Sequence, residues 1–374
     1  MGNRINILPD DVLCHILSFV PTEEVVATSV LSKRWKPLWR SVPALDFTCW
    51  NYSSNDKARF RFVQSVSTFI LSRDLNQPLK RFRIRCCSSV FDSAFFNAWL
   101  TTAAQSRVEH IDLCMDLKII VLPSILLNCS TLVVLKLTCQ EMSGFSSVHL
   151  PSLKILHLVV FLERTHLAAF LCGTPNLEDL VTKCVRFSHY ETKGIFRRLP
   201  KLLRAVIVKD AVPLDVLYNV HFLRIEKMDD KHIEDQLQIP MFHNLTQIEL
   251  CYFDYAHYWI DLFEILEYCP KLQNLSIYME CPENAPERGV KEDWSCPPRV
   301  PKCISFHLIS CCLNKYSGTF GEFEFAKYIL QNARVLRDMT ISTCEDEEEK
   351  EKLEMIKELS LCIRISSTCK LSFN

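Results

Sequence analysis

The first segment of the chain, residues 6–42, has the apolar spacing of three short helices in succession. In the first helix, four apolar residues at i, i+3, i+4 and i+7 share one face: Leu13, Ile16, Leu17 and Val20. Glu23 and Glu24 open the second helix, because acidic residues are favoured in a first turn. The third repeats the apolar spacing at Trp35, Leu38, Trp39 and Val42. Pro37 lacks a backbone donor one turn inside it, so we expect this helix to be irregular or short.

The spacing of apolar residues over 46–78 predicts a helical linker. Its apolar residues recur at helical spacing and end before a Pro-containing turn at residues 76–78: Phe60, Val63, Val66, Phe69 and Ile70. We expect this helix to pack between the N-terminal helices and the next region.

From Leu79 onward a short unit recurs, with apolar residues at its first, fourth and sixth positions. Nine copies begin at residues 79, 108, 132, 153, 177, 202, 220, 245 and 272. Successive starts lie 18 to 29 residues apart, close to the roughly 20–29-residue period of leucine-rich repeats. Each copy fits a strand whose fourth and sixth residues point inward. The pattern predicts an α/β fold with an irregular, horseshoe-shaped leucine-rich-repeat solenoid over residues 79–281. An unrelated α/β sheet is the alternative.

The residues between the inward positions would form one polar surface of mixed charge, which suits an extended protein partner. The candidate target-binding residues are Arg81, Arg83, Arg85, His110, Asp112, Lys136, His157, Arg204, Arg224, Gln247 and Tyr278. The row of three arginines at 81, 83 and 85 could bind an acidic peptide or a phosphate, or could keep an edge strand from pairing. Alternatively, each of these side chains is simply a solvated strand position.

Composition excludes several classes of function. The 374 residues are 48% hydrophobic and 23% charged, which is typical of a folded protein. A formal net charge of −1 gives no global field to attract nucleic acid or an anionic membrane. The longest apolar run, residues 119–129, is too short to span a bilayer. The 19 cysteines follow no secretory signal, so we expect a reducing compartment, the nucleus or the cytoplasm, and many buried thiols.

The sequence offers no constellation of residues typical of catalysis, and we expect a protein that is not an enzyme and holds no cofactor. There is no Cys-x-x-Cys pair to anchor a zinc ion. Asp254, His257 and Asp261 share helical spacing and could mimic a metal site, but a surface helix explains them better. We therefore predict no metal site.

Residues 1–45 resemble an F-box. The resemblance rests on Leu8-Pro9, the acidic Asp11, the apolar face from Val12 to Leu17, and residues 30–39 with both tryptophans, a form similar to that of plant F-boxes. It implies docking onto a Skp-type adaptor and, through it, onto the cullin and RING subunits of a ubiquitin ligase. The residues that would bind the adaptor or hold the F-box together are Leu8, Pro9, Asp11, Val12, Leu13, Ile16, Leu31, Trp35, Leu38 and Trp39. A three-helix cap on a larger domain is the alternative.

Residues 282–374 resemble the FBD domain that follows the F-box and repeats in many plant proteins. The motifs are Trp294-x-x-Pro297, Gly318-x-x-Gly321-Glu322 and Leu336-x-x-Met339-x-Ile341. We expect an α/β cap on the end of the repeats, with strands over 303–309 and 335–341 and a helix over 322–333.

These features together predict the substrate-recognition subunit of a Skp–cullin–F-box E3 ubiquitin ligase. Such a subunit needs no catalytic side chain, since it acts by holding a target near a charged ubiquitin-conjugating enzyme. The alternative is a leucine-rich-repeat scaffold that acts without a ubiquitin ligase.

Overall fold

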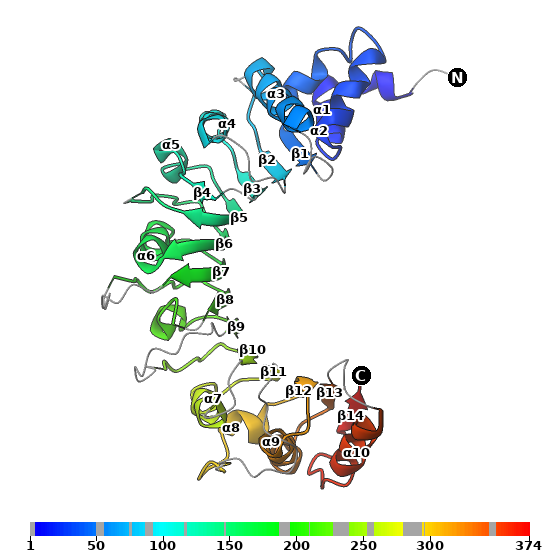
Figure 1. Cartoon of the computed structure of the whole chain (residues 1–374), viewed down its shortest axis with the longest axis vertical. Coiled ribbons are helices and arrows are strands. Elements are labelled where there is room, and N and C mark those ends of the chain that lie inside the picture. Colours follow the sequence, from blue (N-terminus) through cyan, green and yellow to red (C-terminus); the bar gives the residue numbers. More distant parts are fainter. Residues whose placement is uncertain are drawn as a thin grey trace. The chain divides into compact units, whose positions relative to one another are not determined.

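The structure is a computed structural model that describes residues 4–49, 56–74, 77–86, 93–115, 118–145, 147–186, 195–208, 210–226, 239–252, 258–279, 294, 296–343 and 349–374. These residues form two compact units, Met1–Arg197 and Arg198–Asn374. Figure 1 shows the elements of both units, and each unit is described by itself.

Short helices begin the first unit, as the apolar spacing predicts. A 3₁₀ turn, η1 (Arg4–Ile7), precedes the helices α1 (Asp10–Leu17) and α2 (Thr22–Ala27). Pro9 and Pro21 stand directly before α1 and α2, where a proline costs no helical hydrogen bond. Helix α2 runs directly into a 3₁₀ turn, η2 (Thr28–Val30), and the third helix is reduced to a second 3₁₀ turn, η3 (Leu38–Ser41). The irregularity expected at Pro37 is therefore confirmed.

Parallel strands and the helices between them follow in the rest of the first unit. The strands are β1 (Ala44–Cys49), β2 (Arg81–Cys86), β3 (His110–Met115), β4 (Ile119–Ile120), β5 (Val134–Met142), β6 (Ile155–Glu163) and β7 (Asp179–Arg186). They pair in the order β1-β2-β3-β5-β6-β7, with β4 beside β5. The helices α3 (Asp56–Ser72), α4 (Ser93–Gln105), α5 (Ser124–Leu127) and α6 (Arg164–Gly173) connect them, and α4, α5 and α6 lie along one side of the strands (Figure 1).

Equivalent apolar positions of successive copies are partners across the strands. One row of fully buried residues consists of Phe82, Ile111, Leu135, Leu156 and Leu180, the fourth positions of five copies. The residues on either side of Phe82 are partly exposed, so burial alternates along β2 as expected for a strand with one face in the core. The apolar side chains buried along these rows form the core of the unit.

The linker begins with a strand, and the expectation of an all-helical linker over 46–78 is wrong there. Strand β1 pairs in parallel with β2, and its buried Leu45 and Phe47 lie opposite Phe82 and Ile84. The helix predicted after it is confirmed as α3. Because β2 lies between β1 and β3, its arginines do not protect an edge strand, and that interpretation is wrong.

A buried arginine joins the N-terminal helices to the strands. The Arg73 guanidinium donates hydrogen bonds to the carbonyls of Val42, Gln77 and Pro78, the last at 2.9 Å. Burial lowers the pKa of Arg73 to about 10, so this side chain is still charged at neutral pH. Carbonyl oxygens thereby accept from both terminal nitrogens of a charged group that is costly to bury.

Among the described residues of the second unit, seven parallel strands pair in sequence order. They are β8 (Arg204–Val208), β9 (Phe222–Glu226), β10 (Gln247–Tyr252), β11 (Asn274–Met279), β12 (Ser310–Tyr316), β13 (Asp338–Thr343) and β14 (Lys370–Phe373). The helical elements are η4 (Leu214–Leu217), α7 (Tyr258–Glu267), α8 (Lys302–Phe306), α9 (Phe320–Asn332) and α10 (Glu349–Ser360). All nine predicted copies therefore overlap strands.

The C-terminal region extends the same ladder of strands. Leu275 of β11 pairs with Cys311, Cys311 with Met339, and Met339 with Leu371. The strand expected over 303–309 is wrong, since Pro301 precedes the short helix α8 and the strand starts at residue 310. An apolar run this short fits either a helical turn or a strand, so its periodicity does not decide between them. The predicted helix is confirmed as α9, and the strand expected over 335–341 forms as β13.

Candidate functional site

The ten predicted adaptor-binding residues divide by burial. Leu13, Trp35 and Leu38 are at most 5% exposed and belong to the core of the N-terminal helices. Leu8 and Trp39 are partly buried against that core, and the Trp39 ring meets the Phe69 ring edge-on at 5.1 Å between centroids. These five side chains hold the helices together.

The other five predicted residues are exposed. Pro9 and Asp11 lie at the start of α1, while the large apolar residues Val12, Ile16 and Leu31 are 38%, 41% and 64% exposed. Four further exposed apolar residues were not predicted: Ile5, Ile7, Phe19 and Val30. Their apolar character next to predicted positions is the signal in the sequence. Seven large apolar side chains within residues 5–31 are thus in contact with solvent, which is typical of a protein-binding surface.

An ion pair fixes the relative position of the segments that carry this surface. The Arg34 guanidinium lies 2.6 Å from the Asp10 carboxylate and also donates a hydrogen bond to the Leu8 carbonyl. It thereby holds the segment after Leu31 beside the start of α1.

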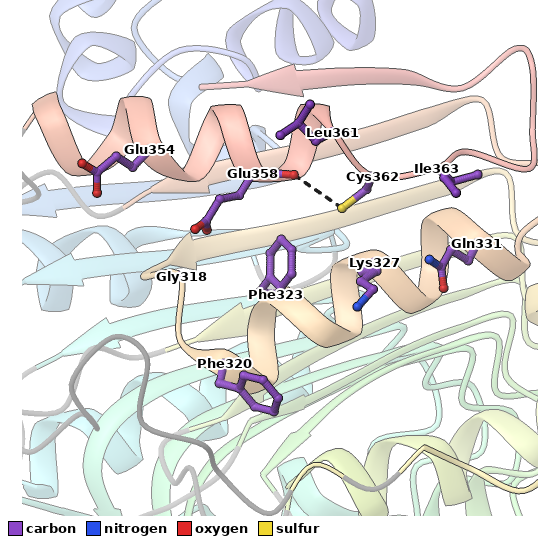
Figure 2. Close-up of a pocket in the computed structure, with 10 residues that line it drawn as sticks. All are labelled: Gly318, Phe320, Phe323, Lys327, Gln331, Glu354, Glu358, Leu361, Cys362 and Ile363. Atoms are coloured by element: carbon purple, nitrogen blue, oxygen red, sulfur yellow. Dashed lines mark hydrogen bonds between the residues drawn. The ribbon is translucent and has the colours of Figure 1, made fainter.

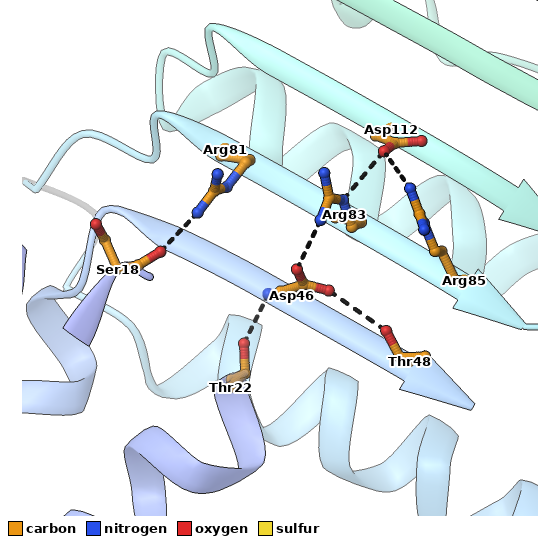
Figure 3. Close-up of polar contacts among 8 residues, drawn as sticks. All are labelled: Ser18, Thr22, Asp46, Thr48, Arg81, Arg83, Arg85 and Asp112. Atoms are coloured by element: carbon orange, nitrogen blue, oxygen red, sulfur yellow. Dashed lines mark hydrogen bonds and ion pairs between the residues drawn. The ribbon is translucent and has the colours of Figure 1, made fainter. Parts of the chain in front are cut away.

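The three predicted arginines of β2 point to one side of the strand and already have partners (Figure 3). The Arg83 guanidinium bridges the carboxylates of Asp46 and Asp112, at 3.1 and 3.0 Å. Arg85 reaches Asp112 at 3.3 Å, and Arg81 donates a 2.6 Å hydrogen bond to the Ser18 carbonyl after α1. Two cations, Arg83 and Arg85, thus share two carboxylates. The third, Arg81, is tied to the N-terminal helices.

Other predicted target-binding residues of the first unit continue this polar face. Asp112 pairs in register with Lys136, and Lys136 with His157, so charged residues follow one another across neighbouring strands. The His157 ring lies 3.2 Å from the Asp179 carboxylate. His110 is exposed at the start of β3.

In the second unit, a compact polar cluster surrounds Arg224. Its guanidinium lies 3.1 Å from the Glu226 carboxylate and 3.2 Å from that of Glu249, and 5.1 Å above the Tyr278 ring. Gln247 donates a hydrogen bond to Glu249 at 3.2 Å. Burial raises the pKa of Tyr278, and the negative charge of Glu249 raises it further. Separately, the Arg204 guanidinium lies 4.9 Å above the Phe222 ring. Thus Arg224, Gln247 and Tyr278 come together, and Arg204 has a different partner.

Half of the cysteines that the structure describes are buried, and most of the others are partly buried. Burial raises the pKa of Cys139 and of Cys303 to about 12, so neither is a thiolate at neutral pH. No group of three His, Cys, Asp or Glu side chains suited to a metal ion occurs in the described part of the chain. Asp254 and His257, part of the metal-like spacing, lie outside it. None of the helices that the structure describes combines the length and apolar character needed to cross a bilayer.

Known proteins resemble this chain along its full length. The family model of the F-box domain matches residues 5–46, and the FBD model matches residues 297–341. An FBD-associated F-box protein of Arabidopsis thaliana is 30% identical, with 100% of both chains covered. An F-box/FBD/LRR-repeat protein of the same plant is 30% identical over 100% of this chain and 99% of its own. Another FBD-associated F-box protein of that plant is 31% identical over 99% of this chain and 97% of its own. The chain therefore belongs to the plant F-box/FBD/LRR-repeat protein family.

Proposed function

We propose that this protein is the substrate-recognition subunit of a Skp–cullin–F-box E3 ubiquitin ligase. The observation that carries the proposal is the exposed apolar surface of its F-box, in particular Ile7, Val12, Ile16, Val30 and Leu31. An adaptor that covers these side chains would remove a large apolar area from water, and each fully buried one contributes about 1.5–3 kcal/mol. The F-box would then link the chain to the cullin and RING subunits, in the nucleus or the cytoplasm.

The parallel strands would supply target recognition. We propose that they form an irregular leucine-rich-repeat solenoid, in support of which each of the nine sequence copies overlaps a strand and neighbouring copies share one register. Two candidate surfaces for the protein target are the polar face along β2, β3, β5 and β6 in the first unit and, in the second unit, the cluster around Arg224. Such a receptor acts by proximity and uses no catalytic side chain of its own.

Adaptor binding is tested with changes at exposed apolar positions, because these leave the core intact. We expect Ile16→Asp combined with Leu31→Asp to weaken binding of a purified Skp-type adaptor at least 100-fold in isothermal titration. The matched control is Phe60→Asp with Leu71→Asp on α3, which alters two residues 69% and 82% exposed outside the F-box match. The control variant should bind as the unaltered chain does.

Two results of the titration would contradict the proposal or a part of it. If the unaltered chain binds no adaptor, the protein is a repeat-type scaffold that acts without a ubiquitin ligase. If the F-box variant binds as tightly as the control, the adaptor uses another surface, and the role given to Ile16 and Leu31 is wrong. Circular dichroism of each variant confirms that the fold is unchanged.

A further inference from the structure

A groove of about 700 Å³ lies between the last two helices of the second unit, α9 and α10 (Figure 2). From α9, the residues that line it are spaced at i, i+3, i+7 and i+11: Phe320, Phe323, Lys327 and Gln331. From α10 and the segment after it, the lining residues include Glu354, Glu358, Leu361 and Ile363. Two helical stripes therefore face one another across the groove.

Contacts within the chain hold the two walls of the groove together. Met355 and Leu359 of α10 are buried on the side of the helix that packs into the unit. Beyond the end of α10, the Ile365 amide donates a 3.0 Å hydrogen bond to the Leu330 carbonyl of α9. Within the wall formed by α10 and the segment after it, the Cys362 thiol lies 3.6 Å from the Glu358 carbonyl. The groove is thus held in shape by contacts within the C-terminal region.

Large apolar side chains line the groove and remain in contact with solvent. Phe320 and Phe323 are half-buried on α9, while Leu361 is 85% exposed and Ile363 76% exposed. Figure 2 shows the Phe323 ring and the Glu358 side chain reaching toward one another from the two helices. Exposed apolar residues beside a hollow are typical of a surface that binds another protein segment.

The charged side chains that line the groove indicate which charge a binding partner would carry. Lys327, a cation of the groove, is 2.9 Å from the Glu324 carboxylate, so its charge is compensated within α9. Glu354 and Glu358 are exposed and have no ion-pair partner among the residues that the structure describes. The groove therefore presents two uncompensated carboxylates next to apolar rings, and it disfavours an acidic ligand or an anionic membrane.

We propose that this groove binds a basic amphipathic helix of a partner protein. The apolar face of that helix would cover Phe320, Phe323 and Leu361, in the manner of helix-in-groove recognition. Lys or Arg side chains one turn apart would reach Glu354 and Glu358, which are themselves one turn apart on α10. The groove belongs to the second unit, so this binding is independent of the F-box and of the adaptor.

The test measures binding of a defined peptide to the full chain by fluorescence anisotropy. The probe is a labelled helical peptide with Leu at i, i+3, i+4 and i+7 and Lys elsewhere, and its counterpart carries Glu in place of Lys. We expect Glu354→Lys with Glu358→Lys to weaken binding of the Lys peptide at least tenfold. Leu361→Ser should weaken it several-fold, and the Glu peptide should bind at least tenfold more weakly to the unaltered chain.

A charge-matched control separates the groove from general electrostatic attraction. Glu264→Lys with Glu267→Lys makes the same change in net charge at two exposed positions of α7 in the same unit. This control should change binding less than twofold. Equal weakening by the control and groove variants, or no weakening by either, would overturn the proposal. Unchanged adaptor binding by all variants keeps the outcome separate from that of the F-box experiment, and matched thermal unfolding excludes misfolding.

Discussion

At the scale of single residues, partners decide which charged side chains are available for binding. The arginines of β2 form the most distinctive row in the sequence, yet Arg83 already lies between Asp46 and Asp112. Partly exposed pairs of this kind contribute about 0–1 kcal/mol each, so they order the surface more than they stabilise it. A target would have to compete with these contacts or bind the arginines together with their carboxylates.

A buried carboxyl in the C-terminal region makes stability depend on pH. Glu322 closes a capping box at the start of α9 and accepts hydrogen bonds from the Ser317 and Thr319 amides at 2.9 and 3.1 Å. Burial raises the pKa of Glu322 from 4.5 to about 7, against the lowering effect of these donors. The folded state then holds this proton more tightly than the unfolded chain. The stabilisation is complete below pH 4.5 and is lost as the pH rises through about 7.

We predict that Glu322→Gln removes this part of the pH dependence. Glutamine keeps an oxygen that can accept from the two amides, but it does not titrate. Urea unfolding of the full chain, followed by circular dichroism, gives the free energy of unfolding of both proteins at each pH. The advantage of the unaltered chain over the variant should fall between pH 4.5 and about 7. A difference that stays constant across this window would contradict the raised pKa.

At the scale of elements, repetition in the sequence predicts strands better than any single segment does. The first, fourth and sixth apolar positions recur in nine copies, so each copy supports the assignment of the others. Strand β1 carries the same unit at Val42, Leu45 and Phe47, but it was missed because the helical pattern before it runs through Val42. Helix α8 was missed because a short apolar run has no period of its own.

Close packing between elements is a property that the sequence does not reveal, and Gly173 is an example. It ends α6, and its carbonyl accepts a 2.9 Å hydrogen bond from the Leu150 amide. A Cβ atom at this position would lie 2.1 Å from the Val148 carbonyl oxygen, which belongs to the backbone and cannot simply rotate away. Only glycine lets α6 approach this segment so closely.

We predict that Gly173→Ala lowers the free energy of unfolding by about 1–3 kcal/mol, the usual cost of overpacking. The control is Thr165→Ser, at an exposed position of the same helix, which should change stability by less than about 0.5 kcal/mol. Chemical denaturation of both variants provides the comparison. Unchanged stability of Gly173→Ala would mean that the backbone at Val148 moves at no cost.

At the scale of the whole molecule, the sequence predicts the order of regions but not the surfaces they offer. The F-box, the repeated strands and the FBD region follow from ordered motifs and spacing. Which F-box residues are core and which are exposed depends on packing, since Leu13 and Ile16 share one helical face yet are 0% and 41% exposed. The groove between α9 and α10 likewise arises from the folded second unit, because its lining residues are separated in sequence.

We propose above all that this chain joins a ubiquitin ligase through its F-box. The most direct measurement is size-exclusion chromatography with light scattering of the full chain mixed with a purified Skp-type adaptor and a cullin–RING pair. We predict that the chain elutes with the cullin only when the adaptor is present, and that Ile16→Asp with Leu31→Asp abolishes this co-elution. A chain that elutes alone in the complete mixture would contradict the claim.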